Sequence, residues 1–352
     1  MKSTICIVED REACEPCLRL LLLSLNRYSP GAAVSLFYPP AKQEFLSWIR
    51  KYPQVQLQPD RLKSDYGWNV KPQAIMHLMD QGHDEVIWID SDVIVNRDVY
   101  SAFSNLNENI FVATEHTLGE ERWDPNALRA RSWGLPVGRV LPFGLNSGVL
   151  RVTRAHRSLM ERWWELLQSG TYQDFQRSAW GQRPVHMLGD QDVLTALLTS
   201  KEFAGIPLHI LQRGKDIIQF DGVYGYTITE RLTNVLDGCA IFIHSAAGKP
   251  WSELWERPKS LREYIKLIYL DVSPYTISAL PFRCELGCDT AWMEPHFALS
   301  KILRMLGFGR AALVGLPIAI AMEPGRIAKW VRRPISPDPS LMETVGTELS
   351  KQ

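Results

Sequence analysis

The strongest chemical signal in the sequence is a pair of aspartates, Asp90 and Asp92, that directly follows the apolar run Ile87–Ile89. On an extended segment, side chains two positions apart point to the same side, so these carboxylates project together. Two carboxylates that close repel each other unless a cation lies between them. A hard divalent ion such as Mn²⁺ or Mg²⁺, which also binds phosphate oxygens, fits this arrangement. The alternative is a solvated turn, because Asp and Ser favour turns.

Two further polar clusters follow along the chain. The segment Asn146-Ser147-Gly148 begins a strand-like run, where glycine allows close backbone approach and Asn146 can hydrogen-bond a sugar hydroxyl. The segment Asp190-Gln191-Asp192 begins a helical pattern and can bind sugar hydroxyls next to an anomeric carbon. The alternatives are an ordinary Asn-Ser-Gly turn for the first cluster and helix capping by an aspartate for the second.

The last cluster follows the apolar run 240–243. His244 at a strand end is a suitable third ligand for a divalent ion. Gly248 allows the backbone to approach a phosphate, and Lys249 supplies positive charge to a leaving diphosphate. Taken singly, the histidine is more often structural and the lysine more often part of a loop.

These clusters lie in a chain whose pattern alternates strands and helices, which predicts an α/β fold with a mostly parallel central sheet and right-handed crossovers. In such sheets, ligands bind at the carboxyl ends of the strands, which makes the clusters that directly follow a strand the first candidates for chemistry. We expect a long loop over 115–141 that carries acceptor contacts. The expected strands are 4–8, 33–38, 55–57, 85–89, 110–114, 147–152 and 240–243, and the expected helices are 18–25, 43–50, 72–80, 157–167, 192–198 and 261–270.

The composition limits the class of protein. The chain has 352 residues, enough to bury a sizeable core in one to three domains. Lys plus Arg number 39 and Asp plus Glu number 39, which argues against a globally basic nucleic-acid binder, so we expect no nucleic-acid partner. Hydrophobic residues make up 45% and charged residues 22%, as is typical of a soluble globular protein.

The cysteines and apolar stretches indicate the compartment. Six cysteines are few for this length and favour a reducing setting, so we expect a cytoplasmic protein. An alternative use for four of them is a zinc site formed by Cys14, Cys17, Cys284 and Cys288. The first residues include no long apolar region, and the longest apolar stretch, 311–322, is too short to span a bilayer. We therefore expect neither a signal peptide nor a membrane-spanning helix.

The four clusters, in this order, resemble the motifs of retaining glycosyltransferases of the GT-A fold, especially the family-eight group of glycogenins and bacterial lipooligosaccharide galactosyltransferases. That group has an apolar strand ending in D-x-D, an N-[SA]-G-V strand, a D-Q-D or D-Q-G helix start and a closing H-x-x-G-x-x-K-P-W segment. The matching segments are Asp90-Ser91-Asp92, Asn146-Ser147-Gly148-Val149, Asp190-Gln191-Asp192 and His244 to Trp251. The resemblance implies a GT-A catalytic domain over 1–270, and we expect a helical extension with a mobile tail over 271–352.

The resemblance implies a role for each matched residue. The ligands of Mn²⁺ or Mg²⁺ would be Asp90, Asp92 and His244. The contacts to a nucleotide-sugar donor, most simply a UDP-sugar, would be Glu9, Asp10, Lys71, Asn146, Ser147, Gly148, Gly248 and Lys249. The residues at the reacting sugar would be Asp190, Gln191 and Asp192.

The chain departs from the family pattern at two of these positions. The spacing from His244 to Lys249 is one residue shorter than in the family, and Lys71 stands where the family usually has an Arg with bidentate geometry.

The implied reaction is metal-dependent transfer of a sugar, with retention of configuration, to a hydroxyl of a glycan or lipid-linked acceptor, as in polysaccharide or lipopolysaccharide biosynthesis. Same-face attack fits better than a covalent intermediate, because Gln191 is a poor nucleophile and only Asp190 or Asp192 is left for the other route. The main alternative is a catalytically silent nucleotide-sugar or glycan-binding protein on the same fold. A phosphohydrolase fits poorly because the D-x-D motif lies far from the first strand. A sugar nucleotidyltransferase needs a glycine-rich loop, and residues 9–17 include no glycine.

The net charge of zero results from two parts of the chain with opposite net charge. The segment 296–333 has a balance of +6, so the remainder has −6 and includes the four aspartates of the motifs. Its apolar residues Phe297, Ile302, Leu303, Leu306 and Trp330 can form one face. We expect this segment to dock on an anionic membrane, which would make the protein peripheral on the inner face. The alternative is that the apolar face packs on the catalytic domain or on a second subunit.

Overall fold

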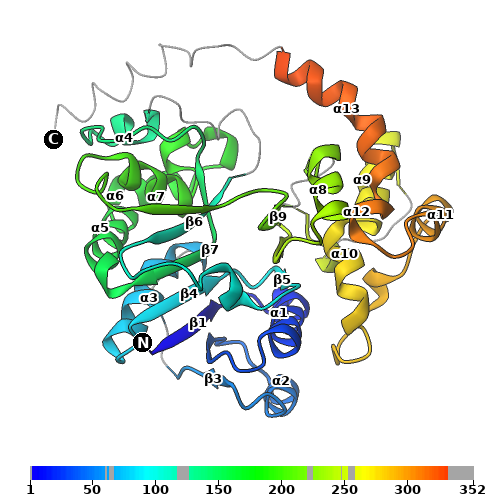
Figure 1. Cartoon of the computed structure of the whole chain (residues 1–352), viewed down its shortest axis with the longest axis horizontal. Helices are drawn as coiled ribbons and strands as arrows, with labels where there is room; N and C mark the ends of the chain where they lie inside the picture. The colour runs from blue at the N-terminus through cyan, green and yellow to red at the C-terminus, as the bar shows by residue number, and fades with distance from the viewer. Residues whose placement is uncertain are drawn as a thin grey trace.

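A seven-stranded sheet forms the centre of the computed structural model, which describes residues 2–59, 62, 67–116, 127–219, 225–246, 248–252 and 258–331 (Figure 1). Its strand order is β3-β2-β1-β4-β7-β6-β8. The strands are β1 (Ser3–Val8), β2 (Val34–Phe37), β3 (Val55–Leu57), β4 (Glu85–Ile89), β6 (Phe111–Glu115), β7 (Leu145–Thr153) and β8 (Leu208–Leu211). The sheet is mostly parallel, and β7 alone among these strands runs antiparallel to its two neighbours.

The direction of β7 matters for the site. Because Val149 of β7 pairs with Ile89 of β4, the amino end of β7 lies beside the carboxyl end of β4. The backbone N–H of Asp90 continues this contact by donating to the Gly148 carbonyl at 2.8 Å. The motifs Asp90–Asp92 and Asn146–Gly148 therefore meet at one edge of the sheet, although one follows a strand and the other begins one.

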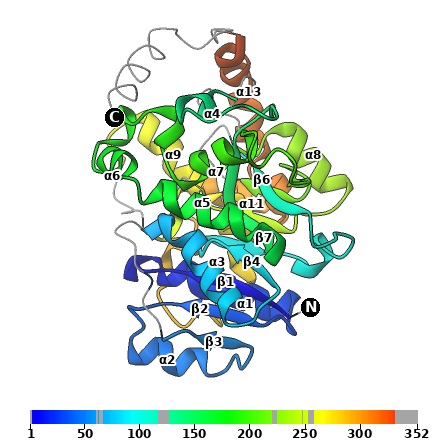
Figure 2. The same ribbon diagram turned by 90° about the vertical axis from the view of Figure 1, so that its left-hand side faces the viewer.

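Helices cover both faces of the sheet with separate apolar cores. On one face pack α3 (Lys71–Asp80), α5 (Arg157–Leu167) and α7 (Asp190–Thr199), of which α3 and α5 lie toward the viewer in Figure 2. The opposite face packs against α1 (Glu15–Tyr28) and α2 (Gln43–Ile49). All five residues of β4 are buried, as expected for a strand covered on both sides.

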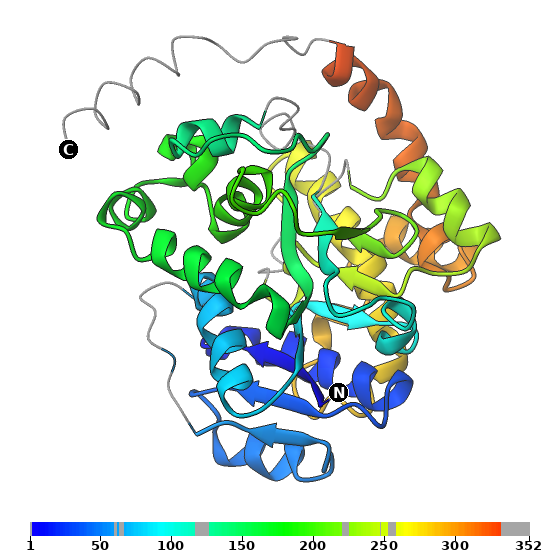
Figure 3. The same cartoon turned by 60° about the vertical axis from the view of Figure 1, so that its left-hand side comes forward.

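A second, three-stranded sheet lies between the main sheet and the carboxyl-terminal helices (Figures 1 and 3). It has the order β5-β10-β9, formed by β5 (Val93–Val95), β10 (Phe242–His244) and β9 (Ile217–Gln219). In β10 the pairing of His244 with Val93 brings the histidine beside the aspartate pair, which ends one residue before Val93. This small sheet thus brings together the first and fourth motifs, which supply the candidate metal ligands.

Helices of the last third gather on one side of the molecule (Figure 1). They are α8 (Ile228–Leu236), α9 (Leu261–Asp271), α10 (Pro274–Ala279), α11 (Ala298–Leu306), α12 (Ala311–Val314) and α13 (Leu316–Val331). Arg231 of α8, 1% exposed, ties this group together by donating to the carbonyls of Ala311 and Ala312, both at 3.0 Å. No helix in the described part of the chain is long and apolar enough to cross a membrane.

The predicted α/β class, the mostly parallel sheet and the helical carboxyl-terminal extension are confirmed. Every expected strand and helix is present, with ends that differ by a few residues. Two differences concern sheets and loops. The predicted loop over 115–141 includes a short helix, α4 (Leu128–Ser132), and residues 117–126 lie outside the described ones. The strands β5, β8 and β9 and the helices α6 (Gly170–Gln176) and α8 (Ile228–Leu236) were not predicted from the sequence. The domain boundary near residue 270 stays a prediction, and the predicted mobile tail lies outside the described residues, which end at 331.

Candidate active site

The predicted site residues line one cleft of about 620 Å³ at the edge of the sheet where β4 ends and β7 begins. The lining comes from the loop after β1, the start of α3, the loop after β4, the start of α7 and the segment after β10. Of the predicted residues, Glu9, Asp10, Lys71, Asp90, Asp92, Asn146, Asp190, Gln191, Asp192, His244 and Lys249 line it. Ser147 and Gly148 lie directly beneath, as their contacts below show. Gly248 does not line the cleft, and its carbonyl oxygen accepts a hydrogen bond from Ser245 Oγ.

Three of these residues form a group able to hold a metal ion. One ligand atom from each of Asp90, Asp92 and His244 lies within 4.8 Å of the others. His244 Nε2 is 3.3 Å from Asp92 Oδ1 and 3.9 Å from Asp90 Oδ2. An octahedral ion with bonds of about 2.1 Å holds neighbouring ligand atoms roughly 3 Å apart, so the group needs little adjustment. Two carboxylates and one imidazole suit Mn²⁺ or Mg²⁺ by their chemistry.

Two lysines neutralise these carboxylates. Lys249 Nζ donates to Asp92 Oδ2, and Lys71 Nζ lies 3.1 Å from Asp90 Oδ1. Burial raises the pKa of Asp92, but the charges of Lys249 and His244 outweigh it and bring that pKa below its usual value. Burial lowers the pKa of Lys249, and the Asp92 carboxylate raises it above its usual value. Both partners of the Lys249–Asp92 pair are therefore ionised.

The position of His244 depends on Gly148. A Cβ atom at residue 148 would lie 2.7 Å from Cε1 and 3.0 Å from Nδ1 of the imidazole ring. It would also lie 2.8 Å from Asn146 Oδ1, which accepts a hydrogen bond from the Gly148 N–H at 2.8 Å. The glycine of the second motif thus makes room for the histidine of the fourth motif.

Lys71, the first residue of α3, joins three motifs. Its Nζ donates to Ser147 Oγ at 2.7 Å and lies 3.3 Å from Asp190 Oδ2, in addition to its contact with Asp90. Ser147 Oγ in turn donates to Asp190 Oδ2 at 2.8 Å. Burial lowers the pKa of Lys71, whereas Asp190 and Asp90 raise it above its usual value. The lysine side chain is 4% exposed, so it organises the floor of the cleft from below.

Gln191 faces the cleft within a chain of hydrogen bonds. Asn146 Nδ2 donates to Gln191 Oε1 at 2.8 Å, and Gln191 Nε2 donates to His116 Nε2 at 2.5 Å. His116 directly follows β6 and was not predicted as a site residue. Its signal was the same as that of the aspartate pair, namely a polar residue just after a predicted strand.

Asp192 is occupied by structural contacts. Its Oδ1 accepts from Arg129 Nε at 2.9 Å, and its Oδ2 accepts from the Gly189 N–H at 3.1 Å, which caps α7. Both charged side chains of the pair are almost fully buried. Although Asp192 borders the cleft, the capping role that the sequence left open is the one its contacts support.

Glu9 and Asp10 follow one another along the chain, but the Glu9 carboxylate is engaged in structural contacts and Asp10 is exposed. The Glu9 carboxylate is 2% exposed and accepts from the backbone N–H groups of Asp10 and Arg11, from the Arg11 guanidinium and from Ser91 Oγ. It therefore shapes the loop after β1. Asp10 is exposed at the cleft and free to contact a ligand.

Three tryptophans that were not predicted as site residues also line the cleft. Trp88 Nε1 donates to Asp90 Oδ1 at 2.7 Å and so fixes the first aspartate. Trp68 is 42% exposed and Trp180 is 55% exposed. Indole faces that border a cleft suit stacking on a sugar or a nucleobase. The four-thiolate zinc site is absent from the described residues, because Cys284 is exposed and neither it nor Cys288 joins the Cys14–Cys17 group.

Comparisons with known proteins concern the fold. No protein-family model matches this sequence, and no curated protein matches it. Among solved structures, the chain is similar to mouse xyloside xylosyltransferase 1, with 16% identity, 70% of this chain and 98% of that chain covered, and a TM-score of 0.43. It is similar to the glycosyltransferase GlyE of Streptococcus pneumoniae, with 18% identity, coverages of 80% and 64% and a TM-score of 0.44.

A further similar structure is the galactosyltransferase LgtC in complex with donor and acceptor sugar analogues, with 15% identity, coverages of 80% and 99% and a TM-score of 0.45. All three are glycosyltransferases, the class that the four sequence motifs resemble. Because each of these TM-scores is below 0.5, the function is argued from the side chains of the cleft and not from these likenesses.

Proposed function

We propose that this chain is a metal-dependent glycosyltransferase that moves a sugar from a nucleotide-diphosphate donor, most simply a UDP-sugar, to a hydroxyl of a glycan or lipid-linked acceptor. The observation that carries the proposal is the group Asp90, Asp92 and His244, which opens with Lys249 on a cleft of about 620 Å³. A volume of this order suits a ligand of nucleotide-sugar size. The polar amides and aromatic side chains of the rim suit sugar hydroxyls and ring faces.

The ion would be held by Asp90, Asp92 and His244, and when bound it supplies positive charge to the diphosphate oxygens of the donor. Lys249 is next to Asp92 and neutralises charge that develops on the leaving diphosphate. Because Lys249 is bonded to Asp92 Oδ2, its ammonium already lies at the cleft without reorganisation. Trp88 and Lys71 keep Asp90 oriented toward the same space.

The reacting sugar would lie against Gln191, Asn146 and Asp190. The neutral Gln191 amide is held between Asn146 and His116, an arrangement that suits hydrogen bonds to hydroxyls and not nucleophilic attack. The Asp190 carboxylate is bonded to Lys71 and Ser147, and that of Asp192 is bonded to Arg129. With both aspartates engaged, we favour same-face attack by the acceptor hydroxyl, which retains the anomeric configuration.

The alternative is a nucleotide-sugar or glycan-binding protein without activity. The two functions separate by donor hydrolysis with Mn²⁺ compared with EDTA, measured as released nucleoside diphosphate over a panel of nucleotide-sugars. We expect one sugar nucleotide to be turned over with Mn²⁺ and not with EDTA, and Asp90→Ala to lower that rate by at least about 100-fold, a loss of roughly 2.7 kcal/mol. Equal turnover in Asp90→Ala would remove the site assignment, and tight binding without turnover would favour the alternative.

We further propose that the carboxyl-terminal helices dock on an anionic membrane, where a lipid-linked acceptor would be available. Part of the predicted apolar face supports this, because Ile302 and Leu306 of α11 are 51% and 65% exposed, and Met305 is 76% exposed. Two exposed basic residues, Lys301 and Arg310, flank these apolar residues along the chain. The other part packs inward, since Leu303 is buried and Phe297 contacts Tyr264. The side chain of Trp330 lies outside the described ones.

A further inference from the structure

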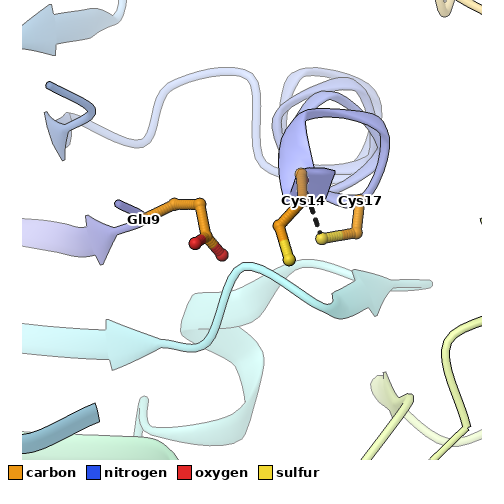
Figure 4. A group of neighbouring side chains, drawn as sticks. All are labelled: Glu9, Cys14 and Cys17. Carbon is orange, nitrogen blue, oxygen red and sulfur yellow. Dashed lines mark hydrogen bonds between the residues drawn. The ribbon is translucent and has the colours of Figure 1, made fainter. Parts of the chain in front are cut away.

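Two cysteines at the start of α1 lie beneath the aspartate pair. Cys14 is the residue that precedes α1, and Cys17 is in its first turn, with Pro16 between them. The Cys17 thiol donates to the Cys14 carbonyl oxygen at 2.9 Å. Both sulfurs and a Glu9 carboxylate oxygen lie within 4.8 Å of one another, and Figure 4 shows the three side chains pointing together. This places a Cys-x-x-Cys segment at a helix start, inside the β1-α1-β2 unit.

The two thiols differ in access and in acidity. Cys14 is 7% exposed, whereas Cys17 has no exposed surface. The Cys17 thiol lies close enough to the Cys14 sulfur to lower the pKa of Cys14 through a side-chain hydrogen bond, while burial raises the pKa of Cys17 above its usual value. The amino end of a helix also favours a thiolate. Cys14 is therefore the thiol that a dissolved reagent meets first, and Cys17 is the thiol placed to follow.

A metal ion is a poor occupant of this group because Glu9 has no oxygen to spare. Its Oε1 accepts from Asp10 N, Arg11 N and Arg11 Nε at 2.8 to 3.0 Å. Its Oε2 accepts from Arg11 Nη2 at 2.9 Å and from Ser91 Oγ at 2.5 Å. Five donors fill about four lone-pair positions, so a bond to a metal would have to break existing contacts. Two thiols alone form an incomplete site for a soft cation.

We propose that Cys14 and Cys17 form a reversible dithiol–disulfide site that is oxidised by a small-molecule disulfide such as glutathione disulfide. The Cys14 thiolate attacks one sulfur of the reagent, forms a mixed disulfide and releases one glutathione thiolate. Cys17 then loses its proton and attacks the Cys14 sulfur, which releases the second glutathione. The protein loses two electrons and two protons, and two molecules of reduced glutathione carry them. Positions three apart in a helical turn are near enough for the bond.

The site lies next to the metal-ligand loop, which gives the bond a consequence. Cys17 Sγ is 3.8 Å from Ser91 Oγ, and Ser91 stands between Asp90 and Asp92. Ser91 Oγ also donates to Glu9, which holds the loop after β1. A Cys14–Cys17 bond removes the hydrogen of the Cys17 thiol and ties to Cys14 the sulfur that lies against Ser91. We expect oxidation to lower donor turnover several-fold, an effect that rests on the proposed function.

The test uses mass spectrometry of the folded chain in glutathione buffers, in a Cys284→Ser/Cys288→Ser background that removes the other cysteine pair. After acid quenching and alkylation, we expect the peptide with Cys14 and Cys17 to lack two hydrogen atoms and to recover them with dithiothreitol. Cys17→Ser should stop at a mixed disulfide on Cys14. The matched control is Cys6→Ser, a change at a fully buried cysteine of β1, which should react like the background.

Three results would overturn the proposal. The first is a Cys14–Cys17 peptide that stays fully reduced in oxidised buffer, and the second is a glutathione adduct on Cys14 that never closes. The third is one zinc ion per chain that survives dialysis and is lost in Cys14→Ser. Because the bond is detected by mass, the result does not depend on sugar transfer. Turnover measured before and after oxidation then tests the coupling separately.

Discussion

Gly148 is the residue on which the position of His244 depends most directly. We expect Gly148→Ala to weaken Mn²⁺ binding by about tenfold or more, roughly 1.4 kcal/mol, because the new Cβ would lie 2.7 Å from the imidazole Cε1. The measurement is Mn²⁺ affinity, with circular dichroism to verify the fold.

The matched control is Gly170→Ala, since a Cβ at residue 170 meets nothing within 4 Å. Affinity that is equal in Gly148→Ala and the wild type would show that the ring does not have to lie against this backbone.

The sequence identified most of the polar floor of the cleft because three of the motifs adjoin a strand that could be recognised, and the motif at Asp190 begins a helix that could be recognised. Asp90, Asn146 and His244 were predicted in this way, and all three line the cleft. The hydrogen-bond and ion-pair partners of the site residues could not be predicted from the sequence. Nothing in the spacing shows that Glu9 and Asp192 are saturated by Arg11 and Arg129, because those contacts depend on side-chain directions in the folded chain.

Among the elements, α4 and α7 are joined by one buried ion pair. Arg129 of α4 is 1% exposed and Asp192 at the start of α7 is 5% exposed, with Nε and Oδ1 2.9 Å apart. We expect Arg129→Met to lower the free energy of unfolding by about 3–5 kcal/mol, because it leaves a buried carboxylate without its partner. Chemical denaturation measures this loss.

The comparison is Arg177→Ala, which breaks the exposed pair with Asp174 and should cost about 1 kcal/mol or less. If the two variants lose similar stability, the Arg129–Asp192 pair does not join the helices as described.

The strands missed from the sequence are short. The strands β5 and β9 have three residues each and β8 has four, too few to show a clear period of two, and β5 follows β4 after only three residues. The fully buried strand β4, apolar apart from Glu85, and the amphipathic helix α5 were predicted with their correct ends, because burial on both faces or on one stripe leaves a clear pattern.

The whole molecule is divided between a cleft rich in carboxylates and a carboxyl-terminal group of helices with exposed apolar side chains. We expect the protein to float with anionic liposomes at low salt and not with neutral ones. Ile302→Glu/Leu306→Glu should abolish flotation by removing apolar contact and adding negative charge.

Val140→Glu is the matched control, because Val140 is 54% exposed but lies outside the carboxyl-terminal helices. Flotation that is unchanged in the α11 variant, or absent in the wild type, would contradict membrane docking and would indicate that this apolar face contacts a protein.

The central claim is that Asp90, Asp92 and His244 hold the divalent ion that binds a nucleoside diphosphate. The most direct measurement is the electron paramagnetic resonance signal of free Mn²⁺, titrated with protein in the presence of UDP. We predict one bound Mn²⁺ per wild-type chain and at least about tenfold weaker binding in Asp92→Asn, equivalent to roughly 1.4 kcal/mol. Equal Mn²⁺ affinity in the wild type and in Asp92→Asn would contradict the account.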